Sequence, residues 1–174
     1  WSATYATGAA NGQQVGYGFT SGPNIGLIWT GTAASSITLD TPGTESTVAQ
    51  ATDGTTQVGS AITPASLGSS RAYVWQGSAA SGVEIHPAGL ESSVAYSIRD
   101  GAIVGTGEDF DFFRLGLYWP KADAPAQIIK PTGFEETILS DLADGWLFGD
   151  ASGIPTNNQR HAILFSAADP ETYI

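Results

Sequence analysis

Residues 47–76, TVAQATDGTTQVGSAITPASLGSSRAYVWQ, hold three features that return throughout the chain. The pair Val58-Gly59 recurs as Val15-Gly16, Val104-Gly105 and Phe148-Gly149. Trp75, which closes an apolar run, recurs as Trp29, Trp119 and Phe165, and Ala49 recurs as Ala6, Ala95 and Leu139. Because all three features share a period of about 45 residues, the chain is a four-fold sequence repeat.

Each repeat is expected to contain four short antiparallel strands. In the second copy these are predicted over 47–51, 55–61, 71–76 and 82–86. An Asx-Gly pair favours a tight hairpin between the first and second strands, because these residues tolerate positive φ angles. The four pairs are Asn11-Gly12, Asp53-Gly54, Asp100-Gly101 and Asp144-Gly145. Segments such as Pro42-Gly43 are expected to end the fourth strand, because Pro cannot donate to a strand ladder.

Four antiparallel strands cannot bury both of their faces alone, so neighbouring copies must stack. This predicts one all-β domain over residues 1–174, a β-propeller of four blades with four strands each. The copies are expected at about 1–43, 44–89, 90–133 and 134–174. The chain begins and ends at nearly the same point of the repeat, so the alternative is that its blades form half of a larger ring. We expect the recurring aromatic residues, Trp29, Trp75, Trp119 and Phe165, to lie in the core between blades.

Composition limits the classes of partner. The net charge of −11, from 17 acidic and 6 basic residues, repels phosphate backbones, so no nucleic-acid partner is expected. No apolar run approaches the roughly 20 residues that span a bilayer, so no membrane insertion is expected. The chain has no Cys and therefore no disulfide or thiolate site. An acidic, Lys-poor, Gly/Ser/Thr-rich chain favours an extracellular or cell-surface location.

Two segments carry a resemblance to a known family. The segments 70–75, SRAYVW, and 160–165, RHAILF, resemble the HAF family of extracellular repeats, whose signature joins Asn-x-x-Gly-x-Val-Val-Gly to His-Ala-Phe-Leu-Trp. Its His is matched by His161, while Arg71, Ile25 and Leu115 replace it in the other copies. The resemblance implies an extracytoplasmic, propeller-like repeat domain and brings no catalytic motif.

The connections between the second and third strands differ most between copies, and we expect them to share one face with the Pro-Gly segments. Such loops on a rigid scaffold are the usual home of binding residues. In the third copy the candidate ligand-binding residues are Glu108, Asp109, Asp111, Phe112 and Arg114, a mixture suited to sugar hydroxyls and ring faces. The alternative is a strand extension with inward Phe and solvated Asp side chains. No cofactor is expected, and a Ca²⁺ site at Glu108, Asp109 and Asp111 is the alternative.

In the fourth copy Asn157, Asn158 and Arg160 are candidates for hydroxyl or carboxylate recognition, and the two Asn residues are alternatively turn formers. The favoured function is a binding or adhesion module that recognises a glycan or a protein partner through this loop-built face. A second interpretation is a structural unit that completes a larger propeller or array as a homo-oligomer. A third is a carbohydrate-active enzyme using Glu108, Asp109 or Asp111.

Overall fold

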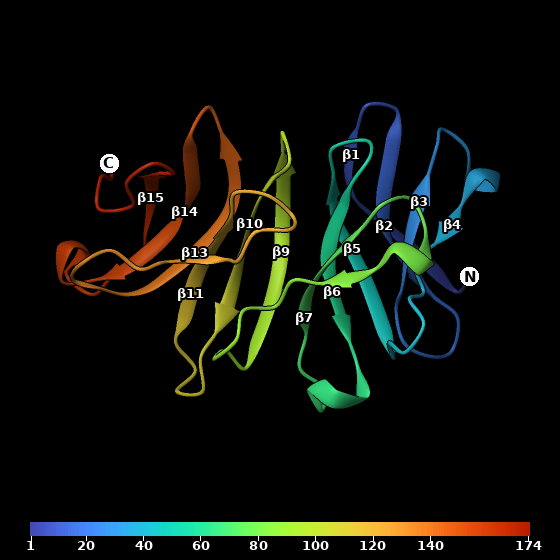
Figure 1. The fold of residues 1–174 in the computed structure, drawn as a ribbon, viewed down its shortest axis with the longest axis horizontal. Coiled ribbons are helices and arrows are strands. Elements are labelled where there is room, and N and C mark those ends of the chain that lie inside the picture. Colours follow the sequence, from blue (N-terminus) through green and yellow to red (C-terminus); the bar gives the residue numbers. More distant parts are fainter. The chain divides into compact units, whose positions relative to one another are not determined.

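The computed structural model describes residues 1–174 and consists of strands joined by turns and four short 3₁₀ helices. The strands form four antiparallel sheets, and there is no α-helix, which confirms the all-β prediction (Figure 1). By internal contacts the chain divides into two compact units, Trp1–His86 and Pro87–Ile174, each with two of the sheets. None of its helical turns has the length and hydrophobicity of a membrane-spanning helix.

The first unit contains two four-stranded sheets whose strands lie in chain order. The first sheet is made of β1 (Ala3–Ala10), β2 (Gln13–Phe19), β3 (Ile25–Trp29) and β4 (Ile37–Thr38). The second is made of β5 (Ser46–Thr52), β6 (Gln57–Ile62), β7 (Arg71–Trp75) and β8 (Val83–Glu84). The connections hold the 3₁₀ helices η1 (Ala33–Ser35), η2 (Pro64–Ser66) and η3 (Ala79–Ser81). All four strands predicted for the second copy are present, with ends shifted by two residues or fewer.

The second unit contains one four-stranded and one three-stranded sheet. The third sheet is made of β9 (Ser92–Arg99), β10 (Ala102–Glu108), β11 (Arg114–Trp119) and β12 (Gln127–Ile129). The fourth is made of β13 (Phe134–Ala143), β14 (Trp146–Gly153) and β15 (His161–Ser166), with η4 (Ile154–Thr156) before β15.

The prediction of four strands is wrong for the last copy, where a single bridge between Phe165 and Tyr173 replaces the fourth strand. A turn in which the Thr172 N–H donates to the Asp169 carbonyl at 2.9 Å precedes this bridge. The turn leaves only the last few residues to run beside β15.

A β-bulge in the first strand of every sheet explains the recurring glycine. The strand pairing skips one residue in each copy, at Thr7, Gln50, Tyr96 and Ser140. Beside each bulge a carbonyl of the first strand points at the glycine of the second strand. A Cβ atom on Gly16, Gly59, Gly105 or Gly149 would lie 1.8, 1.9, 2.0 or 1.8 Å from that oxygen. The glycine therefore has a steric cause, since no larger residue fits without moving the bulge.

Three of the four predicted Asx-Gly hairpins are two-residue turns with positive φ at both positions. Asn11, Asp100 and Asp144 have φ angles of 48°, 51° and 50°. The second copy differs, because residues 53–56 form a longer loop in which the Asp53 carboxylate accepts the N–H groups of Thr55 and Thr56. Burial raises the pKa of Asp53, but these hydrogen bonds lower it by more, so the net pKa lies below its ordinary value.

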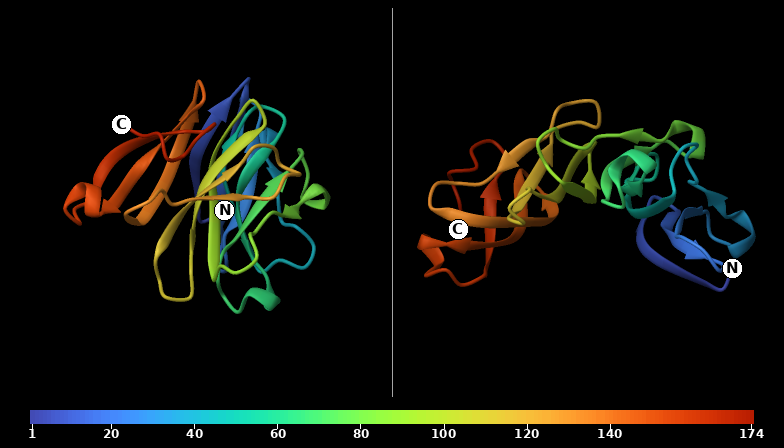
Figure 2. Two further views of the ribbon diagram at one scale, coloured as in Figure 1. Left: turned by 60° about the vertical axis from the view of Figure 1, so that its left-hand side comes forward. Right: turned by 90° about the horizontal axis from the view of Figure 1, so that it is seen from below.

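The two sheets of the first unit lie next to each other (Figure 2), and the core of this unit lies between them. Val15 and Ile28 of the first sheet pack in one buried cluster with side chains from the second sheet, namely Ala49, Ala61, Tyr73 and Trp75. The Trp75 indole N–H also donates to the Thr41 hydroxyl at 2.7 Å. The core of the second unit is built in the same way from Val104, Ile129, Phe134, Leu139, Leu142, Leu147, Ala151, Ile163 and Phe165.

A buried threonine joins the two sheets at the same place in each unit. The Thr47 hydroxyl of β5 accepts the N–H of Gly26 in β3 at 2.8 Å. The Thr137 hydroxyl of β13 accepts the N–H of Gly116 in β11 at 2.7 Å and donates to the Ile129 carbonyl. Both threonines are almost completely buried, at 1% and 0% exposed. A Cβ atom on Gly116 would lie 2.9 Å from Leu139, whereas one on Gly26 would come no closer than 3.3 Å to its neighbours, so the glycine is required more strictly in the second unit.

The prediction that all four recurring aromatic residues lie in the core is confirmed for three of them. Trp75, Trp119 and Phe165 are fully buried. Trp29 is only partly buried, because the face of β3 that carries it lies opposite the face packed against the second sheet. The expectation is wrong for Trp29.

We predict that Gly149→Ala destabilises the protein, because the new methyl group would collide with the Ile138 carbonyl. The expected loss is about 1 to 3 kcal/mol in the free energy of unfolding, measured by urea denaturation. Gly22→Ala is the control, since a Cβ atom at Gly22 meets nothing within 4 Å. Equal unfolding free energies for the two variants would contradict the steric explanation.

Candidate functional site

The two strand two to strand three connections of the second unit lie at the same edge of its sheets, as predicted. One runs over residues 109–113 between β10 and β11, and the other over residues 154–160 between β14 and β15. The carboxylate of Glu136 in β13 joins them, because it accepts the Arg114 N–H at 3.3 Å and the Arg160 guanidinium at 2.5 Å. We call these two connections the loop edge.

The 109–113 connection is a turn held together by Asp109. Its Oδ1 atom accepts the N–H groups of Asp111 and Phe113, each at 3.0 Å. Two backbone hydrogen bonds, from Phe112 N–H to Asp109 O and from Asp109 N–H to Phe113 O, close the turn at 3.1 Å each. The Asp109 side chain therefore stabilises its own turn. Its Oδ1 atom already accepts two hydrogen bonds, so the carboxylate has less capacity to accept hydrogen bonds from a ligand.

The phenyl rings of this turn point outward. Phe110 is 68% exposed, Phe112 is 71% exposed and Phe113 is 42% exposed. The alternative of a strand extension with inward Phe side chains is therefore wrong. The cause is the turn itself, since Phe112 has a φ angle of 66° and interrupts the alternation of a strand. The result is a group of apolar rings on a hydrogen-bonded backbone.

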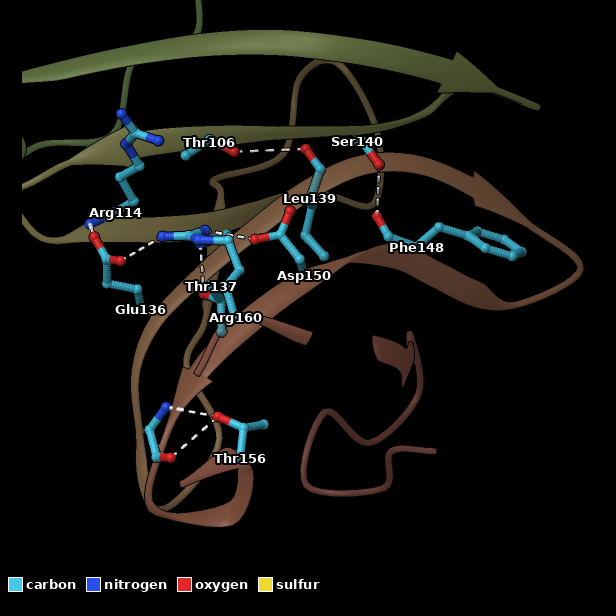
Figure 3. Close-up of polar contacts among 12 residues, drawn as sticks. Thr106, Arg114, Glu136, Thr137, Leu139, Ser140, Phe148, Asp150, Thr156 and Arg160 are labelled. Atoms are coloured by element: carbon cyan, nitrogen blue, oxygen red, sulfur yellow. Dashed lines mark hydrogen bonds and ion pairs between the residues drawn. The ribbon is translucent and has the colours of Figure 1, made fainter. Parts of the chain in front are cut away.

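Arg160, a predicted ligand-binding residue, is engaged within the protein (Figure 3). Its guanidinium binds Asp150 of β14 and Glu136 of β13, with N···O distances of 2.5 Å in both ion pairs. The hydrogen bond and the charge of Asp150 raise the pKa of Arg160, together with the charge of Glu136. Arg160 therefore links two strands at the loop edge, and its charge is already balanced.

Two cationic side chains next to the loop edge, those of Arg114 and Lys130, lie outside this ion-pair group. The guanidinium of Arg114 points away from Glu136 and Arg160, while its backbone N–H binds Glu136 (Figure 3). Lys130 lies on the segment after β12, and its Nζ atom is 5.7 Å from the centre of the Phe113 ring, a cation–π distance. Both side chains are exposed. Arg114 and Lys130 thus present positive charge beside the phenyl rings.

Asn157 and Asn158 form the turn before β15. Both have left-handed backbones, with φ angles of 51° and 57°. Their N–H groups donate to the carbonyls of Ile154 and Gly153 at 3.1 and 2.8 Å. The alternative that they are turn formers is confirmed, and their exposed side-chain amides still face solvent at the loop edge.

The acidic residues of the third copy are spread over a strand end and a turn. No group of three or more His, Asp or Glu side chains in the structure is placed to hold a metal ion. Glu108 ends β10, where it pairs with Ser92 and Arg114, and Asp109 binds its own turn. The carboxylates of Glu108, Asp109 and Asp111, the alternative Ca²⁺ ligands, are thus not grouped around one position in this structure.

Sequence reasoning missed Glu136, which organises the loop edge. The signal for it is a break in the repeat. The matching positions in the other copies are Ala3, Ser46 and Ser92, so only the fourth copy has a charged residue there. No feature of the sequence predicts the contact between Lys130 and Phe113, because it depends on where the segment after β12 lies relative to the 109–113 turn.

We predict that Asp109→Ala loosens the 109–113 turn, because two N–H groups lose their acceptor. The expected effect on the Phe113 amide is faster hydrogen exchange by about threefold to tenfold, corresponding to roughly 0.5 to 1.5 kcal/mol. Asp111→Ala is the matched control, since it removes one carboxylate from the same turn without removing an acceptor. Similar exchange rates in both variants would show that the Asp109 carboxylate does not hold the turn.

The comparisons with known proteins give no relative from which a site could be transferred. No protein-family model matches the chain, and no curated protein matches it either. The resemblance to HAF repeats stays a prediction from the sequence. The function must therefore be argued from the geometry of the chain itself.

Proposed function

We propose that the chain is a binding module that recognises a protein partner through the loop edge. The observation that carries this proposal is the pair of rings on the 109–113 turn, Phe110 and Phe112, which are more than two-thirds exposed on a hydrogen-bonded backbone. Large exposed apolar groups mark interaction surfaces, and aromatic anchors carry much of the binding energy at protein interfaces. Little conformational entropy is lost when the anchor backbone is already ordered.

The polar groups around the rings define the kind of partner. Arg114 and Lys130 are exposed and outside the ion pairs of Arg160, so they are available for a carboxylate of the partner. Phenyl rings bring no hydrogen-bonding group, unlike the polar side chains that select sugar hydroxyls. These features favour a protein with an apolar pocket beside an acidic residue over a glycan.

We also propose that the four sheets are blades of a β-propeller at the cell surface or in the extracellular space. The four similar sheets and the face-to-face packing within each unit support the propeller. The acidic composition, with 17 acidic and 6 basic residues, supports the location.

The test is selection of a displayed random peptide library on the folded protein, with a glycan array in parallel. We expect peptides with an aromatic or aliphatic residue near an acidic residue. Their affinity should fall about tenfold or more in Phe112→Ser, because the substitution removes an aromatic anchor that the bound peptide would cover. Leu67→Ser is the matched control, since Leu67 is 93% exposed on a loop of the first unit.

Three outcomes separate the alternatives. Loss of peptide binding in Phe112→Ser but not in Leu67→Ser supports the protein-binding loop edge. Glycan binding that depends on Phe112 would instead make the loop edge a lectin site. Peptides that bind wild type and Phe112→Ser equally well would contradict the proposed site.

A further inference from the structure

One cross-strand pair recurs on the second and third strands of every sheet. The four pairs are Val15 with Ile28, Val58 with Val74, Val104 with Tyr118, and Phe148 with Leu164. In the first unit, Val15 and Ile28 are buried in the cluster that joins the two sheets. In the second unit, Val104 lies in the corresponding cluster with residues of the fourth sheet. Within each unit, the face of the first sheet that carries this pair therefore covers the second sheet of the same unit.

The covered face of the following sheet carries the recurring aromatic residue. Trp75 of the second sheet and Phe165 of the fourth sheet are both fully buried in these clusters. The same sheet-on-sheet interface thus occurs twice within the chain, once in each unit. One side of it is the cross-strand pair and the other is the aromatic face.

The aromatic face of the first sheet is only partly covered. Trp29 is partly buried, and Trp1, which lies over Gly18 and beside Leu27, is 53% exposed. A pocket of about 370 Å³ opens beside Trp29 and is lined by Thr4, Ala6, Gln14, Gly31, Thr32 and Ala33. None of these residues carries a charge. We call this surface the Trp29 face.

The fourth sheet presents the other half of the interface. Its cross-strand pair, Phe148 and Leu164, is only partly buried, whereas Val15 and Ile28 are completely buried. Ile174, which exchanges two backbone hydrogen bonds with Leu164, is 74% exposed. The charged groups nearby are the Arg160 guanidinium and the two carboxylates that it contacts, those of Asp150 and Glu136, so this group keeps one negative charge. We call this surface the Phe148 face.

We propose that the Trp29 face is a docking surface for a second copy of this chain, which covers it with its Phe148 face. The argument is continuity with an interface that the chain makes twice. Trp29, Phe148 and Leu164 are each partly exposed, and the pocket beside Trp29 is lined by uncharged residues. Because the two faces are different surfaces, each contact joins unlike faces, and we propose a two-fold pair in which each copy covers the Trp29 face of the other. Eight sheets lie within the range of blade numbers that propellers use.

The test is the mass in solution of the wild type, Trp29→Ser and Leu164→Arg, measured by light scattering across a concentration series. We expect twice the chain mass of 18.0 kDa for the wild type and 18.0 kDa for each variant, with circular dichroism showing that both stay folded. Val83→Arg, at an exposed position of β8, and Phe112→Ser, at the loop edge, should keep the wild-type mass.

Mixing the two variants tests whether the Trp29 face of one copy binds the Phe148 face of the other. Trp29→Ser retains an intact Phe148 face and Leu164→Arg retains an intact Trp29 face, so an equimolar mixture should regain the doubled mass through one intact interface. A misfolded variant could not restore it. The proposal is overturned by a wild-type mass of 18.0 kDa throughout the series, by variants that stay paired on their own, or by a mixture that stays at 18.0 kDa.

Discussion

A hydrogen bond between a buried threonine hydroxyl and a glycine N–H in the neighbouring sheet fixes how the sheets of each unit stack. Thr47 binds Gly26 in the first unit, and Thr137 binds Gly116 in the second. Leu39 donates its N–H to the Gly26 carbonyl at 2.7 Å, while the Gly26 N–H binds the Thr47 hydroxyl of the other sheet. A buried N–H without an acceptor is costly, which makes this contact specific as well as stabilising. The apolar side chains of the core cluster in each unit pack around this hydrogen bond.

This stacking also accounts for the loop edge. Because strand β13 is held over the third sheet by Thr137, the adjacent Glu136 reaches both the Arg114 N–H and Arg160. The same strand therefore sets the core and joins two loops that are far apart in the sequence. Binding residues on such an edge are supported by the scaffold, and the exposed phenyl rings rest on a turn whose backbone is already ordered.

The sequence predicted the parts of the fold that depend on local chemistry and on the repeat. The strands of the second copy and three of the Asx-Gly turns follow from residue type and spacing alone. It did not predict the role of Glu136, which depends on how strand β13 packs on the third sheet. Nor did it predict the outward phenyl rings, which depend on the φ angle of Phe112. The partial exposure of Trp29 was also missed, since the repeat assigns every copy the same neighbours.

The most direct test of the threonine contact is hydrogen exchange of the Gly26 and Gly116 amides, measured by NMR in the wild type and in Thr47→Val and Thr137→Val. Both amides should exchange slowly in the wild type, at rates set by opening of the sheet stack. Each substitution should speed exchange only at its own glycine if the rest of the unit stays folded. Fast exchange at both glycines in the wild type, comparable to exposed loop amides, would contradict the stacking described above.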